Sequence, residues 1–249
     1  MIKLVKVCKS FKDQKVLDNL DLIVEPEKIN IIIGRSGSGK SVLLKHIIGL
    51  IRPDSGQIFV DGTDITKINE KTFNEMRKKF GMLFQEAALF DSMTVGENVA
   101  FPIKEHRRLS QKKVDEIVNE KLIQVGLTNV AHKMPSELSG GMKKRVGLAR
   151  AIALDPEIIL FDEPTTGLDP IMCSAINNLI VQTQEHTKAT CIVISHDIES
   201  TFKIAHKVAM LYHGKIIEEG MPGEVKVSGN PVVRQFIEGR QIEQSPKQK

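Results

Sequence analysis

The stretch that decides the fold is Gly34-Arg35-Ser36-Gly37-Ser38-Gly39-Lys40-Ser41, which matches the phosphate-loop pattern G-x-x-x-x-G-K-[ST] at every fixed position. The apolar, β-branched run at residues 29–33 predicts a buried strand before it, and residues 42–50 predict a helix after it. In this context the glycines let the backbone turn successive N–H groups toward an anion, and the helix start adds a positive dipole end. The stretch therefore predicts a nucleoside triphosphate site.

Two side chains at the end of this stretch have the chemistry for a triphosphate and its metal ion. Lys40 is expected to bridge the β- and γ-phosphates, and the Ser41 hydroxyl is expected to hold Mg²⁺. The alternative is a Gly/Ser-rich turn between strand and helix that has no ligand. The agreement of strand, loop, Lys-Ser pair and helix favours the phosphate site.

Composition limits the class of protein. Of the 249 residues 41% are apolar, enough for a proper core, and the net charge of +4 is spread along the chain. With one Tyr and no Trp there are few stacking platforms for single-stranded nucleic acid, so no nucleic-acid partner is expected. Cys8, Cys173 and Cys191 lack C-x-x-C spacing, which predicts small core residues in a reducing compartment rather than a metal site or disulfides.

No apolar run approaches the roughly 20 residues that a membrane-spanning helix needs. Residues 1–7 alternate like a strand and lack the unbroken apolar centre of a signal peptide. We therefore expect a cytosolic or peripheral protein, so that any membrane crossing belongs to another chain.

Strand and helix patterns alternate along the chain, which predicts an α/β fold with a mostly parallel sheet and ligands at the carboxyl ends of its strands. Strands are expected at residues 2–7, 16–24, 29–33, 57–60, 80–84, 157–161, 190–195, 208–211 and 215–218. Helices are expected at residues 42–50, 74–79, 94–100, 112–125, 142–153, 171–184, 198–204 and 232–237.

The region from about residue 86 to 155 shows helical patterning without a convincing strand, so we expect a helical subdomain inserted into the sheet domain. The core then comprises about residues 1–85 and 156–225, and the whole domain about residues 1–240. Residues 226–249 form a C-terminal tail whose polar end, 241–249, is expected to be disordered.

Two acids follow the apolar run at residues 158–161, where a buried strand would emerge at the edge of the sheet. Asp162 suits the coordination shell of Mg²⁺, and Glu163 suits a general base that polarises the attacking water. The alternative for this acidic pair is a helix cap, and the two roles are compatible because Pro164 follows.

A second potential anion site lies at Leu138-Ser139-Gly140-Gly141-Met142, where Ser139 is expected to cap a long helix. One domain rarely needs two such loops for one triphosphate. A dimer resolves this, because the Gly140-Gly141 loop of one copy can close on the γ-phosphate that the other copy holds.

Four further sequence features have residue types that suit a nucleotide site. They are a turn at Gly167-Leu168-Asp169-Pro170, His196 after a strand, Gln85 at the subdomain boundary, and Phe11 in a polar turn near residues 12–14. His196 could reach a γ-phosphate, and the Gln85 amide could reach Mg²⁺ or water. Phe11 could stack on a base or simply cover the sheet edge. The other histidines are interpreted as structural.

In this order, these elements resemble the nucleotide-binding subunit of ABC transporters over about residues 2–220. The resemblance implies a P-loop ATPase with a RecA-like core sheet, an antiparallel β edge, ATP and Mg²⁺ as cofactors, and a head-to-tail dimer that sandwiches two ATP molecules. It implies ATP binding by Phe11 and by Gly34 through Ser41, catalysis by Glu163, His196 and Gln85, metal binding by Ser41, Gln85 and Asp162, and contacts to the partner's ATP from Ser139, Gly140, Gly141 and Asp169.

One departure narrows the resemblance, because Met142 follows the two glycines where the family usually has Gln. Together with residues 81–90, 97–102 and 230–239, this resembles the MlaF-type ATPases of Mla/MCE phospholipid transport. That branch implies a peripheral subunit at the cytoplasmic face of the inner membrane, a polytopic permease and a periplasmic MCE-type lipid-binding protein. Exposed apolar residues such as Leu89, Phe90 and Phe101 would dock the permease, unless they form subdomain core.

Two other functions stay open. A soluble ABC ATPase, for example one serving iron–sulfur assembly, would work without a permease. The ATPase of an ABC importer would hydrolyse ATP in the same way but would drive the transport of another solute.

Overall fold

A computed structural model describes residues 1–239 of the chain, apart from the side chain at position 200. The predicted disordered end, residues 241–249, lies outside the described residues. Ten strands are described: β1 Ile2–Phe11, β2 Gln14–Val24, β3 Ile29–Ile33, β4 Ser55–Val60, β5 Thr63–Asp64, β6 Phe80–Leu83, β7 Ile158–Asp162, β8 Thr190–Ser195, β9 Lys207–Tyr212 and β10 Lys215–Gly220. Nine α-helices are described: α1 Lys40–Ile47, α2 Glu70–Arg77, α3 Val95–His106, α4 Gln111–Gln124, α5 Gly140–Ala151, α6 Pro170–Thr187, α7 Ile198–Phe202, α8 Pro222–Lys226 and α9 Pro231–Ile237.

The strands form two sheets. The larger has the order β10-β9-β3-β8-β7-β6 and is parallel from β9 to β6, with β10 antiparallel at one edge. The smaller sheet is antiparallel, in the order β2-β1-β4-β5. The predicted α/β class, its mostly parallel sheet and its antiparallel edge are confirmed.

Strand β3 shows how sequence places the core, because alternate side chains leave opposite faces of a strand. Ile29, Ile31 and Ile33 join the apolar cluster under the helices, whereas Ile32 joins the cluster that holds α1 between the two sheets. Both faces of this strand are therefore buried, which matches its unbroken apolar run.

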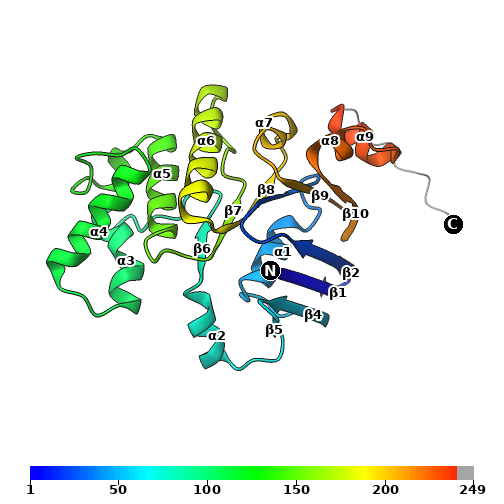
Figure 1. Cartoon of the computed structure of the whole chain (residues 1–249), viewed down its shortest axis with the longest axis horizontal. Coiled ribbons are helices and arrows are strands. Elements are labelled where there is room, and N and C mark those ends of the chain that lie inside the picture. The colour runs from blue at the N-terminus through cyan, green and yellow to red at the C-terminus, as the bar shows by residue number, and fades with distance from the viewer. Residues whose placement is uncertain (240–249) are drawn as a thin grey trace.

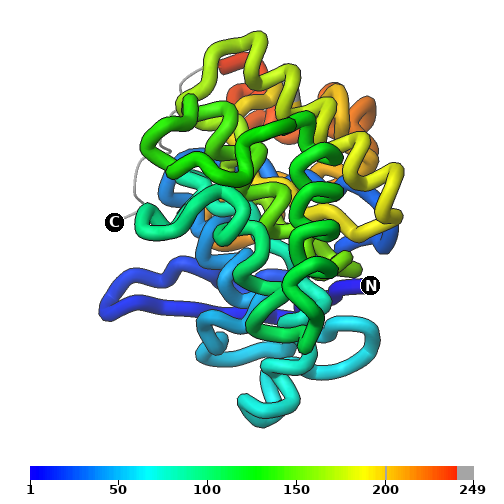
Figure 2. Tube along the Cα trace, turned by 90° about the vertical axis from the view of Figure 1, so that its left-hand side faces the viewer, coloured from blue at the N-terminus to red at the C-terminus, as the bar shows by residue number. Residues whose placement is uncertain are grey.

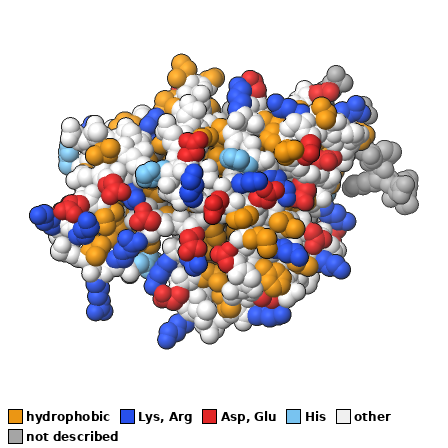
Figure 3. Space-filling model, in the orientation of Figure 1, with side chains coloured by type: hydrophobic (Ala, Val, Ile, Leu, Met, Phe, Trp, Pro, Cys, Tyr) orange, Lys and Arg blue, Asp and Glu red, His pale blue; other side chains and the backbone are white. Residues whose placement is uncertain are grey.

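Between β6 and β7 the described chain has the helices α3, α4 and α5 but no strand. These helices lie together at one end of the molecule (Figure 1), and Figure 2 views them from that end, in front of the β1–β2 hairpin. Acidic and basic side chains are interspersed over the face in Figure 3, as the spread net charge predicts.

Several predicted boundaries were wrong for local reasons. Helix α2 begins at Glu70 rather than residue 74, because the Asn69 side chain accepts a hydrogen bond from the Thr72 amide and caps it. Helix α3 continues past residue 100 to His106, through Pro102. Phe11 is the last residue of β1, paired with Gln14, and not part of the turn. Helix α8 and the short strand β5 were not predicted.

Candidate functional site

The phosphate loop lies at the carboxyl edge of the parallel sheet. It follows β3, and the next strands across the sheet, β8 and β7, end at Ser195 and Asp162. Parallel strands bring their carboxyl ends to one edge, so residues far apart in sequence converge there. His196 and Glu163, which directly follow β8 and β7, come to the loop in this way.

Two glycines of the loop are required by its geometry. Gly39 caps α1 with φ of 104°, in the left-handed region that favours glycine. A Cβ at Gly34 would lie only 2.4 Å from the carbonyl oxygen of Leu211 in β9. The loop therefore passes β9 with no room for a side chain, and then turns directly into α1.

Lys40 is held inside this loop. Its Nζ donates hydrogen bonds to the carbonyl oxygens of Gly34 at 2.8 Å and Arg35 at 3.1 Å, and lies 3.6 Å from Glu163 Oε1. The residue is 5% exposed. Burial lowers the pKa of the Lys40 ammonium, and the Glu163 carboxylate opposes that shift. The charge is thus incompletely compensated, and an anionic ligand would compensate it further.

The loop also contains an unsatisfied polar atom. The Ser38 Oγ is buried without a hydrogen-bond partner among the described residues. Such an atom is costly unless a ligand or water pairs with it. Beside it lies an open hollow of about 930 Å³, lined by Gln14, Lys15, Val16, Arg35, Ser36, Gly37, Ser38, Tyr212, His213 and Gly214. An orphaned hydroxyl, backbone amides and a buried ammonium fit a triphosphate, and the hollow has room for a nucleoside.

Ser41 and Asp162 form the predicted pair of oxygen donors. The Ser41 hydroxyl donates to Asp162 Oδ1 at 3.0 Å, and Asp162 is 8% exposed. Burial raises the pKa of the Asp162 carboxyl, the Ser41 hydrogen bond opposes this shift, and the Glu163 charge adds to it. A divalent cation would stabilise the ionised carboxylate, and a hydroxyl with a carboxylate is the hard-oxygen donor set that Mg²⁺ prefers. These residues fit a magnesium ion.

Glu163 is fixed by two neighbours. Its Oε2 accepts a hydrogen bond from Thr166 Oγ1 at 2.8 Å and is in direct contact with Nδ1 of His196. The Glu163 backbone has φ of 52°, which is uncommon for a residue with a side chain and is typical of functional sites. The His196 side chain is 57% exposed, so it is accessible to a ligand while it contacts Glu163.

Five predicted residues are therefore brought together by these contacts: Lys40, Ser41, Asp162, Glu163 and His196. Ser139, Gly140, Gly141 and Asp169 have no hydrogen bond or ion pair to the phosphate loop within residues 1–239. Ser139 caps α5 as predicted, accepting from the Met142 amide at 3.3 Å, and Asp169 caps α6 through the amides of Ile171 and Met172. Ser139 and Gly140 are exposed.

Phe11 and Gln85 occupy the periphery. The Phe11 ring is 43% exposed, with Lys9 Nζ 5.5 Å from its centroid. Gln85 is exposed, and its backbone carbonyl accepts a hydrogen bond from Lys144.

Sequence reasoning missed residues that only the fold brings to the site. Thr166 could have been suspected from its position three residues after Glu163, at the start of the turn. Tyr212 and His213, which line the hollow beside the loop, follow a strand without any motif of their own. Their place is a consequence of β9 pairing with β3.

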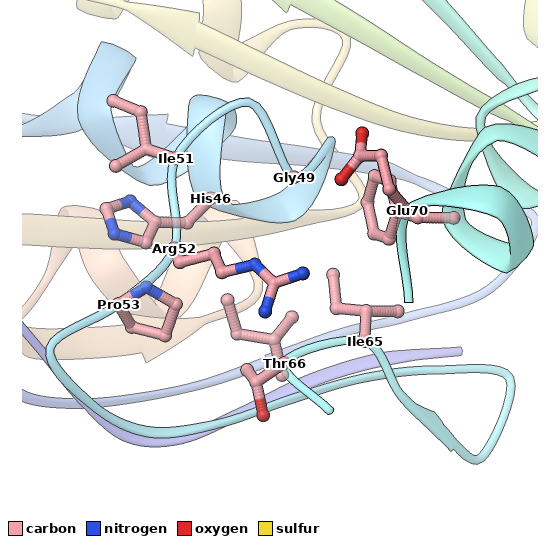
Figure 4. A pocket seen from close by; sticks show the side chains of 10 residues that line it. His46, Gly49, Ile51, Arg52, Pro53, Ile65, Thr66 and Glu70 are labelled. Atoms are coloured by element: carbon pink, nitrogen blue, oxygen red, sulfur yellow. The ribbon is translucent and has the colours of Figure 1, made fainter. Parts of the chain in front are cut away.

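A smaller pocket at the far end of α1 is separate from this site (Figure 4). It has a volume of about 20 Å³, room for no more than a water molecule, and His46, Arg52 and Glu70 contribute to its lining. His46 is 1% exposed and its Nδ1 donates to the Val42 carbonyl at 2.7 Å, in agreement with a structural role.

Comparison with known protein families identifies the family of this chain. Residues 17–166, which include the phosphate loop, the Ser139 loop and the two acids, match the family described as "ABC transporter". The chain belongs to the ABC transporter family. Within the described part of this ABC chain, no helix has both the length and the apolar character to span a bilayer.

Curated relatives extend the match over nearly the whole chain. The intermembrane phospholipid transport ATP-binding proteins MlaF of Haemophilus influenzae and Escherichia coli are 46% and 43% identical over 91% and 90% of this chain, and over 86% and 83% of their own lengths. A "probable ribonucleotide transport ATP-binding protein mkl" of Mycobacterium tuberculosis is 42% identical over 94% of this chain. The match to that mycobacterial relative spans 65% of its length.

Solved structures share the ABC fold. The ATP-binding cassette MJ0796, determined as a dimer bound to ADP and phosphate, superimposes with a TM-score of 0.83 at 30% identity, over 89% of this chain and 99% of that one. The cbiO1 protein of Clostridium perfringens, part of an ABC transporter complex, gives 0.84 at 28% identity, over 94% and 93%. The predicted ABC-type P-loop fold is confirmed.

Proposed function

We propose that this chain is the ATP-hydrolysing subunit of an ABC transporter that moves phospholipid between the inner and outer membranes of a bacterial envelope. The observation that carries the ATPase part is the contact of Lys40, Ser41, Asp162, Glu163 and His196 at one sheet edge. The relatives named for phospholipid transport, which match this chain over most of both lengths, support the cargo.

Lys40, Glu163 and His196 have different roles in hydrolysis. Lys40 exchanges the carbonyls of Gly34 and Arg35 for β- and γ-phosphate oxygens, so its ammonium is pre-positioned and buried where negative charge develops. Glu163 orients the attacking water and accepts its proton, while Thr166 holds the carboxylate in place. His196 contacts the γ-phosphate from the exposed side of Glu163.

A magnesium ion would be held by Ser41, Asp162 and Gln85. When bound, Mg²⁺ supplies positive charge that neutralises the phosphate oxygens. The hydrogen bond between Ser41 and Asp162 already places two of these donors side by side. Gln85 is exposed two residues after the end of β6, so its side chain has the freedom to approach the ion.

Dimerisation completes the site. Among the described residues, no hydrogen bond or ion pair joins Ser139, Gly140, Gly141 or Asp169 to the phosphate loop, and the first two are exposed at the start of α5. We assign them to the ATP held by a second copy, arranged head to tail. Backbone amides at a helix start are suited to a γ-phosphate. Met142, which follows these glycines, is half-buried and packs against the core.

The membrane partner would be a polytopic permease, joined by a periplasmic MCE-type lipid-binding protein, with this chain peripheral on the cytoplasmic face of the inner membrane. An apolar surface suits the permease: Phe84, Phe90 and Phe101 are 36%, 41% and 36% exposed, and the rings of Phe90 and Phe101 lie 4.9 Å apart. Leu89, which the sequence also suggested, is half-buried and packs against the core.

A pull-down of tagged chain in mild detergent, with mass spectrometry of proteins and lipids, tests this function. We expect a permease, an MCE-type protein and phospholipid, and we expect Phe90→Asp to lose them while Leu109→Asp, equally exposed at 41%, keeps them. A permease that carries another solute, including a ribonucleotide, would refute phospholipid as the transported substrate but would leave the role of transport ATPase in place. Soluble scaffold partners alone would favour an iron–sulfur assembly ATPase and refute the transporter.

A further inference from the structure

Helix α5 is attached to the segment 85–88 by two cations, the buried Lys144 and the half-buried Arg150. Lys144 is 6% exposed, and its Nζ donates a hydrogen bond to the Gln85 carbonyl oxygen. Burial lowers the pKa of this ammonium, and the charges of Glu86, Glu163 and Asp162 oppose the shift. Lys144 therefore lies within electrostatic reach of the two acids of the site as well as bonded to the Gln85 backbone.

Arg150, on the same helix, binds the next carbonyls. Its guanidinium donates to the oxygens of Ala87 and Ala88, both at 2.7 Å. These alanines have φ of 59° and 46°, a left-handed conformation that is rare for residues with a side chain and persists only where neighbours fix it. The guanidinium fork is such a neighbour, because it binds both strained peptide units at once.

Close packing joins the same two elements. A Cβ on Gly147 of α5 would lie 2.8 Å from Leu83 Cδ1 and 3.1 Å from the Ala87 Cβ. A Cβ on Gly81 of β6 would lie 2.3 Å from the Ala151 carbonyl oxygen. The helix thus meets β6 and the following segment with no gap, and displacement of the segment from α5 would break both the packing and the three cation–carbonyl hydrogen bonds.

We propose that Lys144 is a positioning residue that makes the Gln85 backbone move with α5 and thereby links the two nucleotide sites of the dimer. The inference rests on the proposed function, in which Gln85 serves the site of its own chain while Ser139, at the start of α5, serves the partner's site. Closure of α5 on the partner's ATP then sets the position of Gln85 at its own ATP. Hydrolysis is consequently cooperative in ATP.

Steady-state hydrolysis by the full chain tests this link, using Lys144→Met, Lys144→Arg and, as a control, Lys112→Met on the exposed face of α4. We expect Lys144→Met to lower kcat about ten-fold, the size of one lost charge-assisted hydrogen bond, with KM changed less than about two-fold and the Hill coefficient falling toward 1. Lys144→Arg should restore most of both, and Lys112→Met should match wild type. A wild-type Hill coefficient of 1, or a Lys144→Met protein with unchanged kcat and cooperativity, overturns the link.

Hydrogen exchange without ATP tests the attachment separately from catalysis. We expect Lys144→Met to speed exchange of peptides covering residues 84–90 and to leave α4 unchanged; equal exchange in the two proteins refutes the attachment. This result stands even if the wild type hydrolyses no ATP, which would refute the proposed function instead. If Lys144→Met does not fold, Lys144→Gln is measured in the same way, with the same two outcomes.

Discussion

The two halves of the proposed ATP site differ in how much of their environment the single chain supplies. On the phosphate-loop side, Lys40 and Asp162 are almost fully buried. Lys40 lies beside Glu163, and Asp162 accepts a hydrogen bond from Ser41. On the α5 side, Ser139 and Gly140 are exposed, and the only hydrogen bond of the Ser139 side chain among the described residues caps its own helix. One half is preorganised by the sheet, and the other presents a helix start to solvent.

The two sides also differ in the charged groups that they bury. Burial lowers the pKa of the Lys40 ammonium and raises the pKa of the Asp162 carboxyl, so it disfavours both charged forms, and a ligand of opposite charge would favour them. On the α5 side, Ser139 and Gly140 are exposed and the Ser139 hydroxyl already accepts the capping hydrogen bond from the Met142 amide. Substitutions on the two sides should therefore have different signatures.

The largest effect is expected for Glu163→Gln, which keeps the shape of the side chain but removes the base. Hydrolysis should fall about 1,000-fold while ATP binding persists, because a general base typically contributes 100- to 10,000-fold. Phosphate release and ATP binding measure the two properties. Glu157→Gln, at the exposed start of the same strand region, is the control. Turnover near wild type would exclude Glu163 as the base.

The next effect is expected for Ser139→Ala, on the opposite side of the comparison. Loss of a phosphate contact should lower kcat about 100-fold, as for one donor to a developing oxyanion, with ATP affinity of the single chain unchanged. Ser110→Ala removes an equivalent capping bond from α4 and controls for helix stability. If both variants lose activity equally, Ser139 acts only as a cap.

Phe11→Ala separates base stacking from sheet-edge covering. If the ring stacks on adenine, KM for ATP should rise about ten-fold with little loss of stability, since one stacked base is worth about 1–3 kcal/mol. Phe11→Tyr should keep the wild-type KM. Titration of ATP with thermal unfolding of each variant measures both quantities, and a stability loss without a change in KM would favour the covering role.

The smallest effect concerns the stability of the ATP-free chain. Lys40→Met should raise the free energy of unfolding by about 1 kcal/mol at pH 7, because burial disfavours the charged ammonium, which the site keeps for function at a cost in stability. The sign follows from the lowered pKa: between the folded and unfolded pKa values the unfolded chain binds more protons, so wild-type stability gains as pH rises through that window. Urea unfolding at pH 7 and 9.5 measures this, and the variant's advantage should shrink at the higher pH. A less stable Lys40→Met would mean that the bonds of Lys40 outweigh its burial.

Much of the fold was predictable because its signals are local. The apolar run at residues 29–33 and the phosphate-loop pattern placed β3, the loop and α1, and the serine cap of α5 was readable from Ser139 followed by two glycines. The boundaries of α2 and α3 were wrong because a cap at Asn69 and continuation through Pro102 depend on neighbours that periodicity does not register.

Residue spacing along the chain was enough to predict the class of fold, the nucleotide loop and the residue types that could do the chemistry, because spacing sets which groups leave a strand or start a helix. Which of these groups meet depends on long-range packing. The strand order β3-β8-β7 brings Asp162, Glu163 and His196 to Lys40 across more than 100 residues of chain, whereas Ser139 is left facing solvent. The same packing brings Lys144 to the Gln85 carbonyl oxygen. This contact could not be predicted, because a long-range hydrogen bond between a buried cation and a backbone carbonyl has no sequence signature.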